Sequence, residues 1–348
     1  MSLSVSTSGA FSLLQTSVTR VRVDLATAQA ELASGKPADY GLTLGAGTSV
    51  LVGLRQQQDR LVTIQQTNGI ARARLDSTAS ILDSLMSDAR TFLQKTVQND
   101  PAAVTPQVVQ QQARDGLAAL RQALNTIVAG QAIFGGIDVD RQVMPQDPTA
   151  PGGVADGAFQ SAFTSAFGFS STSPNVSFLD ASQVSGFLQG SFQNLFSAAS
   201  WQAGWSNAND TPLTSRIGLT RIIDSSVSGN EKAIVDLAKA YATIVDMPLA
   251  QMTPSAGSAA IRVAATNASN AVDGLTALQA RVGTMRADIE ASDKAIALQI
   301  DTLTIAGENL APVDPYATSS RVTELQTQLQ TAYTLTAQLQ KLSLAQYL

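Results

Sequence analysis

The sequence of 348 residues contains no cysteine and no histidine. Without cysteine there are no disulfides, thiol nucleophiles or thiolate-bound zinc, and without histidine the commonest general base is missing. An enzyme would have to use carboxylate, lysine or serine chemistry, so we predict a protein with no catalytic activity, cofactor or metal. A chain without cysteine also suits export in an unfolded state, because no chance disulfide can form on the way.

Charge and long apolar runs are scarce as well. Charged residues make up 14% of the chain and the net charge is −5, so no basic surface suited to nucleic acid is expected. No window of about 20 residues is continuously apolar, which argues against membrane insertion. The N-terminus lacks the basic start and apolar run of a cleavable signal peptide, so we expect none.

Aromatic residues are rare except in the middle of the chain. Nine of the eleven Phe and both Trp lie between Phe134 and Trp205, among many Gly, Ser and Asn. Because aromatic side chains bury large areas, we predict a smaller α+β domain with an aromatic core at 131–230. Trp201 and Trp205 are four residues apart, and an alternative interpretation places them on either side of a sugar-binding groove.

Both ends of the chain carry apolar residues spaced three and four apart. This 3.5-residue repeat is typical of a helix that stays against a partner helix over several turns. The terminal segments have no other core, so these residues must pack against each other or against neighbouring copies. The predicted assembly interface consists of Phe11, Leu14, Val18, Val21, Leu25, Leu32, Val322, Leu325, Leu329, Leu339, Leu342, Leu344 and Leu348.

Longer helical segments lie inward from both ends. A Pro- and Gly-containing break at 34–47 precedes helical patterns at 49–99 and 106–129, and a segment of about fifty residues without proline starts near Ser255. We therefore predict a mainly α fold, an elongated antiparallel rod of N- and C-terminal helices with the middle domain inserted. The expected domains are 1–40 with 311–348, 41–130 with 231–310, and 131–230.

Several segments resemble the flagellin superfamily from one end of the chain to the other. LASGKPADYGLTLGAG at 32–47 is similar to the segment after the first flagellin helix, and 313–348 is similar to the C-terminal block, with Asp314 and Tyr316 opening the last helix. QAIFGGIDVD at 131–140 and the ending LSLAQYL resemble the hook-associated proteins of the hook–filament junction. ADYGLTLG and WQAGWSNANDTPLTSRI are similar to the alphaproteobacterial branch of those proteins.

The resemblance implies a structural subunit of the bacterial flagellum, located outside the cell at the hook–filament junction and exported by the flagellar type III apparatus. It implies self-association in a ring or helical assembly, contacts with the other junction protein and with flagellin, and an export chaperone on the C-terminal helix. The terminal helices would become ordered only on assembly. A filament flagellin, or a cell-surface carbohydrate-binding adhesin, stays open as an alternative.

Overall fold

The computed structural model describes residues 7–97, 106–310 and 312–345. The chain divides into two compact units, and each is described by itself. Unit 1 comprises Met1–Val62 and Ala297–Leu348, and unit 2 comprises Thr63–Ile296. The boundary falls within two long helices, α3 (Thr48–Val97) and α10 (Pro254–Leu310). The predicted three-part division stays a prediction.

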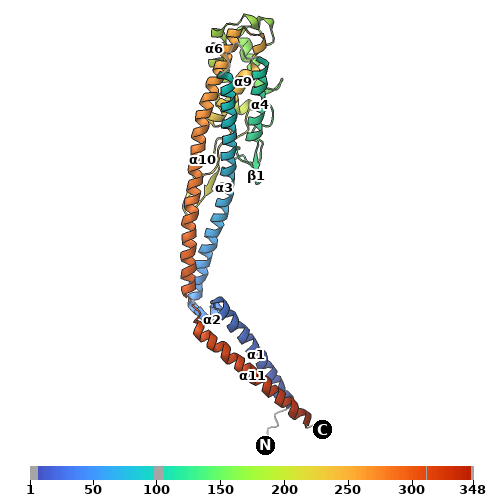
Figure 1. Ribbon diagram of the computed structural model, residues 1–348, viewed down its shortest axis with the longest axis vertical. Helices are drawn as coiled ribbons and strands as arrows, with labels where there is room; N and C mark the ends of the chain where they lie inside the picture. The colour runs from blue at the N-terminus through green and yellow to red at the C-terminus, as the bar shows by residue number, and fades with distance from the viewer. Residues whose placement is uncertain (1–6, 98–105, 311, 346–348) are drawn as a thin grey trace. The chain divides into compact units, whose positions relative to one another are not determined.

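Unit 1 is built from two terminal helices and a short helical connection. Helix α1 (Thr7–Ser34) packs along α11 (Pro315–Ala345), and Figure 1 shows them side by side and antiparallel. The connection consists of α2 (Tyr40–Leu44) and a 3₁₀ turn, η1 (Gly45–Gly47), before α3 begins. The first part of α3 and the last part of α10 complete the unit.

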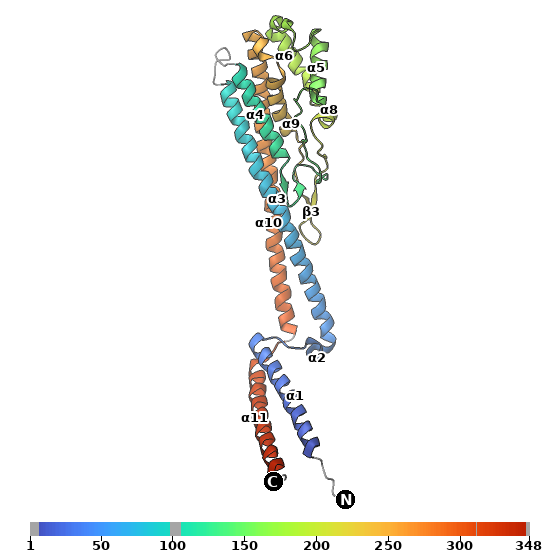
Figure 2. The same ribbon diagram turned by 90° about the vertical axis from the view of Figure 1, so that its right-hand side faces the viewer.

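Unit 2 contains the other helices and two small hairpins, so the predicted mainly α fold class is confirmed. Besides parts of α3 and α10, its longer helices are α4 (Pro106–Leu124), α5 (Val154–Phe167) and α9 (Lys232–Asp246). Figure 2 shows α4, α5 and α9 in a second view. The shorter helices are η2 (Pro174–Phe178), α6 (Ala181–Gln189), α7 (Ser191–Asn194), α8 (Ala198–Gly204) and η3 (Leu249–Gln251).

The two hairpins of unit 2 are short and antiparallel. Strand β1 (Ile127–Val128) pairs with β2 (Gln131–Ala132), and β3 (Thr214–Arg216) pairs with β4 (Ile222–Asp224). The first hairpin corrects the prediction of a helix at 106–129. The helix ends at Leu124 because the next residues form a strand and a tight turn, in which Ala129 and Gly130 have φ of 51° and 80°.

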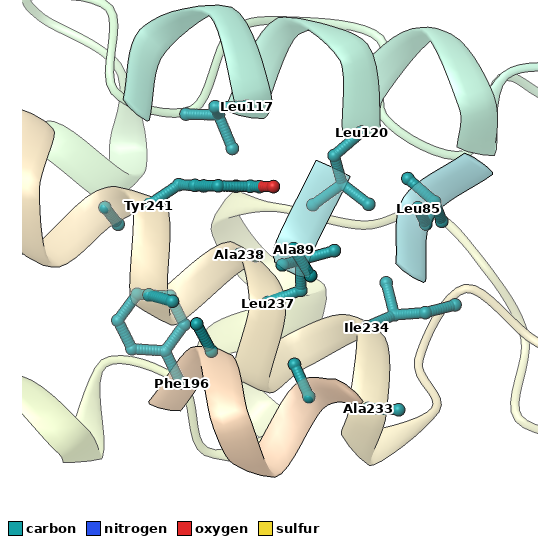
Figure 3. Close-up of a cluster of buried hydrophobic side chains, with 14 of the residues drawn as sticks. Leu85, Ala89, Leu117, Leu120, Phe196, Ala233, Ile234, Leu237, Ala238 and Tyr241 are labelled. Carbon is teal, nitrogen blue, oxygen red and sulfur yellow. The ribbon is translucent and has the colours of Figure 1, made fainter. Parts of the chain in front are cut away.

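Helix α9 lies at the centre of unit 2, and eleven of its fifteen residues are buried. Glycines on its neighbours allow close approach. A Cβ on Gly116 of α4 would lie 2.6 Å from the ring of Tyr241, and one on Gly274 of α10 would lie 2.7 Å from Ala233. Figure 3 shows side chains of α3, α4 and α9 meeting here. Small residues thus let three helices pack around α9.

Aromatic rings fill the outer part of the same core. Phe163 contacts the rings of Phe159, Phe167, Phe169 and Phe187. Trp201 and Trp205 stack with ring centroids 5.3 Å apart and are only 1% and 6% exposed. The interpretation of these two residues as the walls of a sugar-binding groove is therefore wrong, because aromatic packing buries both rings.

Candidate assembly surface

The break after α1 is a sequence of helix-terminating and helix-starting devices. Gly35 has φ of 65°, which glycine adopts without steric cost, and its N–H donates to the carbonyl of Glu31 at 2.8 Å. Asp39 then caps α2, since its Oδ1 accepts from the N–H groups of Gly41 at 2.8 Å and Leu42 at 3.1 Å. The Ser-Gly and acidic positions of this segment therefore determine where one helix stops and the next starts.

The start of α11 follows the same logic. Asp314 Oδ1 accepts from the N–H groups of Tyr316 at 2.8 Å and Ala317 at 3.3 Å, and Pro315 occupies the first helical position, where no N–H is needed. The acidic-Pro-Tyr-Ala segment is thus an N-terminal cap. It sets the first residue of α11.

The structure brings the two predicted apolar seams together. Between α1 and α11, Ala28 and Leu325 are buried, 1% and 8% exposed. Other predicted members on both helices are half-buried: Leu14, Val18, Val21, Leu25, Val322 and Leu329. Leu32 is exposed. Phe11, Leu339, Leu342 and Leu344 lie in the two helices but outside the described side chains, and Leu348 lies outside the described residues.

A second set of apolar side chains on this helix pair points to solvent. Leu13 and Val23 of α1 are 71% and 60% exposed, and Tyr333 and Leu335 of α11 are also exposed. Sequence reasoning missed these positions because they lie outside the 3.5-residue repeat. We call these four residues the exposed apolar set. They lie on more than one side of the helices, since Tyr333 and Leu335 are two positions apart in α11, so several neighbours are needed to cover them.

The remainder of unit 1 holds the connection against the long helices. Arg55 lies over the ring of Tyr40, with its Cζ 4.5 Å from the ring centroid, and Gln58 Nε2 donates to Thr304 Oγ1 at 2.9 Å. A groove of about 430 Å³ beside them is lined by residues of both breaks, such as Lys36 and Val313, and by Glu308 of α10. Across the residues that the structure describes, no acidic cluster could hold a metal ion, and no described helix has an apolar stretch long enough to cross a membrane.

In unit 2, two segments that the resemblance singled out pack against each other. The N–H of Asn209 donates to the carbonyl of Gly135 at 2.9 Å, and the N–H of Ile137 donates to Thr211 at 3.1 Å. Gly136 has φ of 64°, and a Cβ there would lie 2.3 Å from the carbonyl oxygen of Asn209. The Gly-Gly turn at 135–136 and the segment 207–211 thus form one tightly packed site.

Asn230 joins this site to the aromatic core. Its Nδ2 donates to the carbonyl of Ala208 at 2.8 Å and to Asp210 Oδ1 at 2.7 Å, and its Oδ1 accepts from Trp201 Nε1 at 2.9 Å. Sequence reasoning missed Asn230, since a single Asn in a loop carries no periodic signal.

Comparison with known protein families matches both ends of the chain. The bacterial flagellin N-terminal helical region matches residues 5–139, and the bacterial flagellin C-terminal helical region matches residues 265–348. The chain belongs to the flagellin superfamily. Flagellins are structural proteins that self-associate in the flagellum, outside the cell, and this chain has that general role. Comparison with curated proteins gives no significant sequence match.

The flagellin-type fold also has a counterpart among solved structures. The chain is similar to a putative flagellar hook-associated protein from Vibrio parahaemolyticus, with a TM-score of 0.50 and 10% sequence identity. The similarity covers 76% of this chain and 97% of that one. At this identity the likeness concerns the fold.

Proposed function

We propose that this flagellin-superfamily chain is the subunit at the hook–filament junction that joins the hook-side junction protein to flagellin. It reaches that position by export through the flagellar type III apparatus. The single observation that carries an assembly role is the α1–α11 pair, whose seam is only partly buried and which also has the exposed apolar set Leu13, Val23, Tyr333 and Leu335. Neighbouring subunits supply the missing contacts.

The energetics of the two terminal helices support this role. Fixing the backbone costs about 1–2 kcal/mol per residue, and α1 and α11 have 28 and 31 residues. Among their described side chains, the apolar ones that are buried are Ala28 and Leu325. One pair of helices therefore gains little from its own packing, and insertion between several neighbours supplies the rest.

Three features favour the junction over the filament. The ending LSLAQYL and the 131–140 segment resemble junction proteins, and the similar solved structure is titled a hook-associated protein. In this chain the Gly-Gly turn of that segment has a specific structural use, because it packs against residues 207–211. A filament flagellin is the second candidate.

Deletion of the gene tests the junction proposal. We expect hooks without attached filaments and flagellin shed into the medium, with filaments restored by the wild-type gene. Electron microscopy of the cell surface and assay of secreted flagellin provide the measurement. Normal filaments on the deletion strain would reject the junction role, and a purified protein that forms long polymers alone would favour filament flagellin.

The proposed chaperone site is the C-terminal helix. The partly buried seam of α11, with Val322, Leu325 and Leu329, offers an apolar face to an export chaperone before α1 pairs with it. Pull-down of the flagellar export chaperones with the full chain and with a chain ending at residue 314 tests this. Equal binding by both chains would contradict it.

A further inference from the structure

The hairpin formed by β3 and β4 is too short to be stable without support. Each strand has three residues, and such a hairpin is marginal in water. On the strands, Ser215 and Ile223 are half-buried and the residues beside them, including Ile222, are exposed. Ile217, which follows β3 at the tip, is fully buried. The hairpin therefore depends on what holds its inward face against unit 2.

At its base the hairpin is tied by several bonds. The N–H of Ser225 donates to the carbonyl of Leu213 at 2.7 Å, and the N–H of Leu213 donates to Ser226 Oγ at 2.7 Å. These bonds lie at the end of the hairpin that continues into the core at Val227. The tip at 217–221 has a different set of partners.

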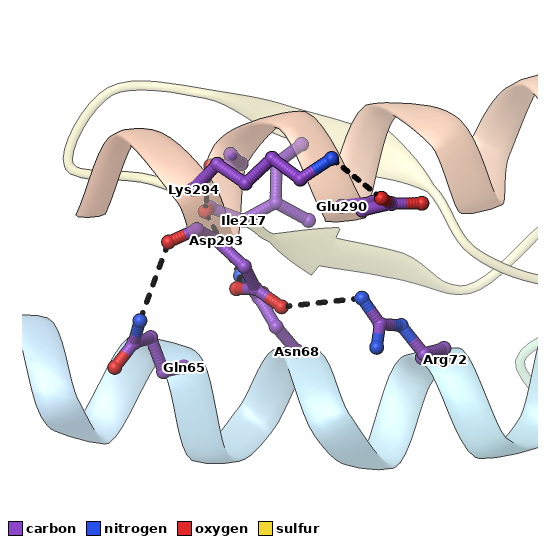
Figure 4. A network of polar contacts seen from close by, with 8 residues as sticks. Gln65, Asn68, Arg72, Ile217, Glu290, Asp293 and Lys294 are labelled. Atoms are coloured by element: carbon purple, nitrogen blue, oxygen red, sulfur yellow. Dashed lines mark hydrogen bonds and ion pairs between the residues drawn. The ribbon is translucent and has the colours of Figure 1, made fainter. Parts of the chain in front are cut away.

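The tip is held by side chains of the two long helices, as Figure 4 shows. Asn68 of α3 donates through Nδ2 to the carbonyl of Ile217 at 3.1 Å and to Asp293 Oδ1 of α10 at 2.6 Å. Ser292 of α10 donates from its hydroxyl to the same carbonyl. Arg221 Nη2 contacts Asp288 Oδ1 at 2.7 Å, but this pair is more exposed.

Asn68 is an unusual residue for its position. It is 1% exposed and lies on the buried face of α3, where the neighbours one turn away are Ile64 and Ala71. Its Oδ1 has no hydrogen-bond partner. A buried amide with one unsatisfied polar atom lowers the stability of the fold compared with an apolar residue of similar size. What Asn68 offers in return is its pair of hydrogen bonds, to the hairpin and to Asp293.

We propose that Asn68 is a latch that keeps the tip of the β3–β4 hairpin on the α3–α10 helix pair, and that the tip opens as a local unit when this latch is removed. Three segments that are distant in sequence meet at one side-chain amide. The Asn68 amide holds a carbonyl group, so its substitution removes hydrogen bonds and no core side chain, and the tip then opens by withdrawing the buried side chain of Ile217.

Amide hydrogen exchange on the full chain tests the proposal. The N–H groups of Ile217 and Gly218, which donate to Arg221 at 3.0 and 3.3 Å, report on the tip, and those of Ser225 and α9 report on the base and the core. In Asn68→Leu we expect tip exchange to accelerate about tenfold, the effect of losing roughly one buried hydrogen bond, with base and core unchanged. Ser292→Ala, a milder variant that keeps Asn68, accelerates the tip less.

Gln65→Leu is the matched control. Gln65 lies close to one turn before Asn68 and its Nε2 donates to the Asp293 carbonyl at 3.3 Å, which is on α10 and not on the hairpin. Tip exchange should be unchanged in this variant. Three results would overturn the proposal: an unchanged tip in Asn68→Leu, equal acceleration of tip, base and core, or a Gln65→Leu effect as large as that of Asn68→Leu.

Discussion

Units 1 and 2 use their apolar residues in opposite ways. Of the nineteen large apolar side chains that are exposed among the described residues, twelve belong to unit 1, the smaller unit. The contiguous hydrophobic core, from Ala71 to Ile289, lies in unit 2. Unit 2 is therefore stabilised by its own packing, whereas unit 1 presents surface that a neighbouring subunit can cover.

The substitution expected to affect unit 1 most, with no effect on unit 2, is Leu325→Asp in α11. Leu325 is the only large apolar residue that is buried among the described side chains of this helix pair, so a charge there should abolish incorporation into the flagellum, while the melting temperature of unit 2 stays unchanged. Complementation of a deletion strain and thermal melting of the purified chain measure both. Gln326→Asp, a charge at the exposed neighbouring position, is the control and should incorporate normally. Normal incorporation of Leu325→Asp would remove the basis of the comparison.

In unit 2 the largest loss of stability is expected from Phe163→Ala. This fully buried ring contacts four others, and its removal leaves a cavity, so the free energy of unfolding should fall by about 3–5 kcal/mol. Denaturant unfolding followed by tryptophan fluorescence is the measurement. Phe178→Ala, at an exposed ring, should stay within about 0.5 kcal/mol of wild type. Similar losses in both variants would contradict the assigned core.

A smaller effect is expected from Gly116→Ala. The new methyl group would lie 2.6 Å from the Tyr241 ring, and the overpacking should cost about 1–3 kcal/mol although alanine is the better helix former. Urea unfolding measures the loss. Gly157→Ala in α5 meets no atom within 4 Å and controls for the helix effect. A stabilised Gly116→Ala would show that α4 and α9 are not in close contact.

The smallest effect compares two glycines in α3, one in each unit. Gly69 in unit 2 and Gly53 in unit 1 both have open space where a Cβ would go. Gly69→Ala should raise the free energy of unfolding of unit 2 by about 0.5–1 kcal/mol, while Gly53→Ala leaves the unfolding of unit 2 unchanged. Equal stabilisation by both would mean that the two units unfold together.

The isolated monomer offers a direct comparison of the units. Disorder of the terminal helices before assembly stays a prediction. Because few of their described side chains are buried, limited proteolysis should remove both helices and leave roughly residues 40–310. Mass spectrometry of the products measures it. Termini that resist protease as well as unit 2 does would contradict the prediction.

Much of the helical architecture could be predicted because it depends on local periodicity. The long segment predicted from Ser255 onward is helix α10, and its buried face in unit 2 repeats every seven residues, for example at Leu275, Val282 and Ile289. The end of α4 could not be predicted, since the helix pattern continued while the pairing of β1 with β2 ended it. Outside the helices, the short strands gave too few residues for a period.

The sequence by itself determined the helices, their buried faces and the flagellin-type ends, because a 3.5-residue repeat and a cap residue act over one or two turns of chain. Only the tertiary structure excluded the alternative of a sugar-binding groove at Trp201 and Trp205, and only it showed that Asn230 joins the Gly-Gly turn to them and that Asn68 reaches Ile217. Each of these depends on a contact between residues that are distant in the chain, and such contacts leave no local pattern in the sequence.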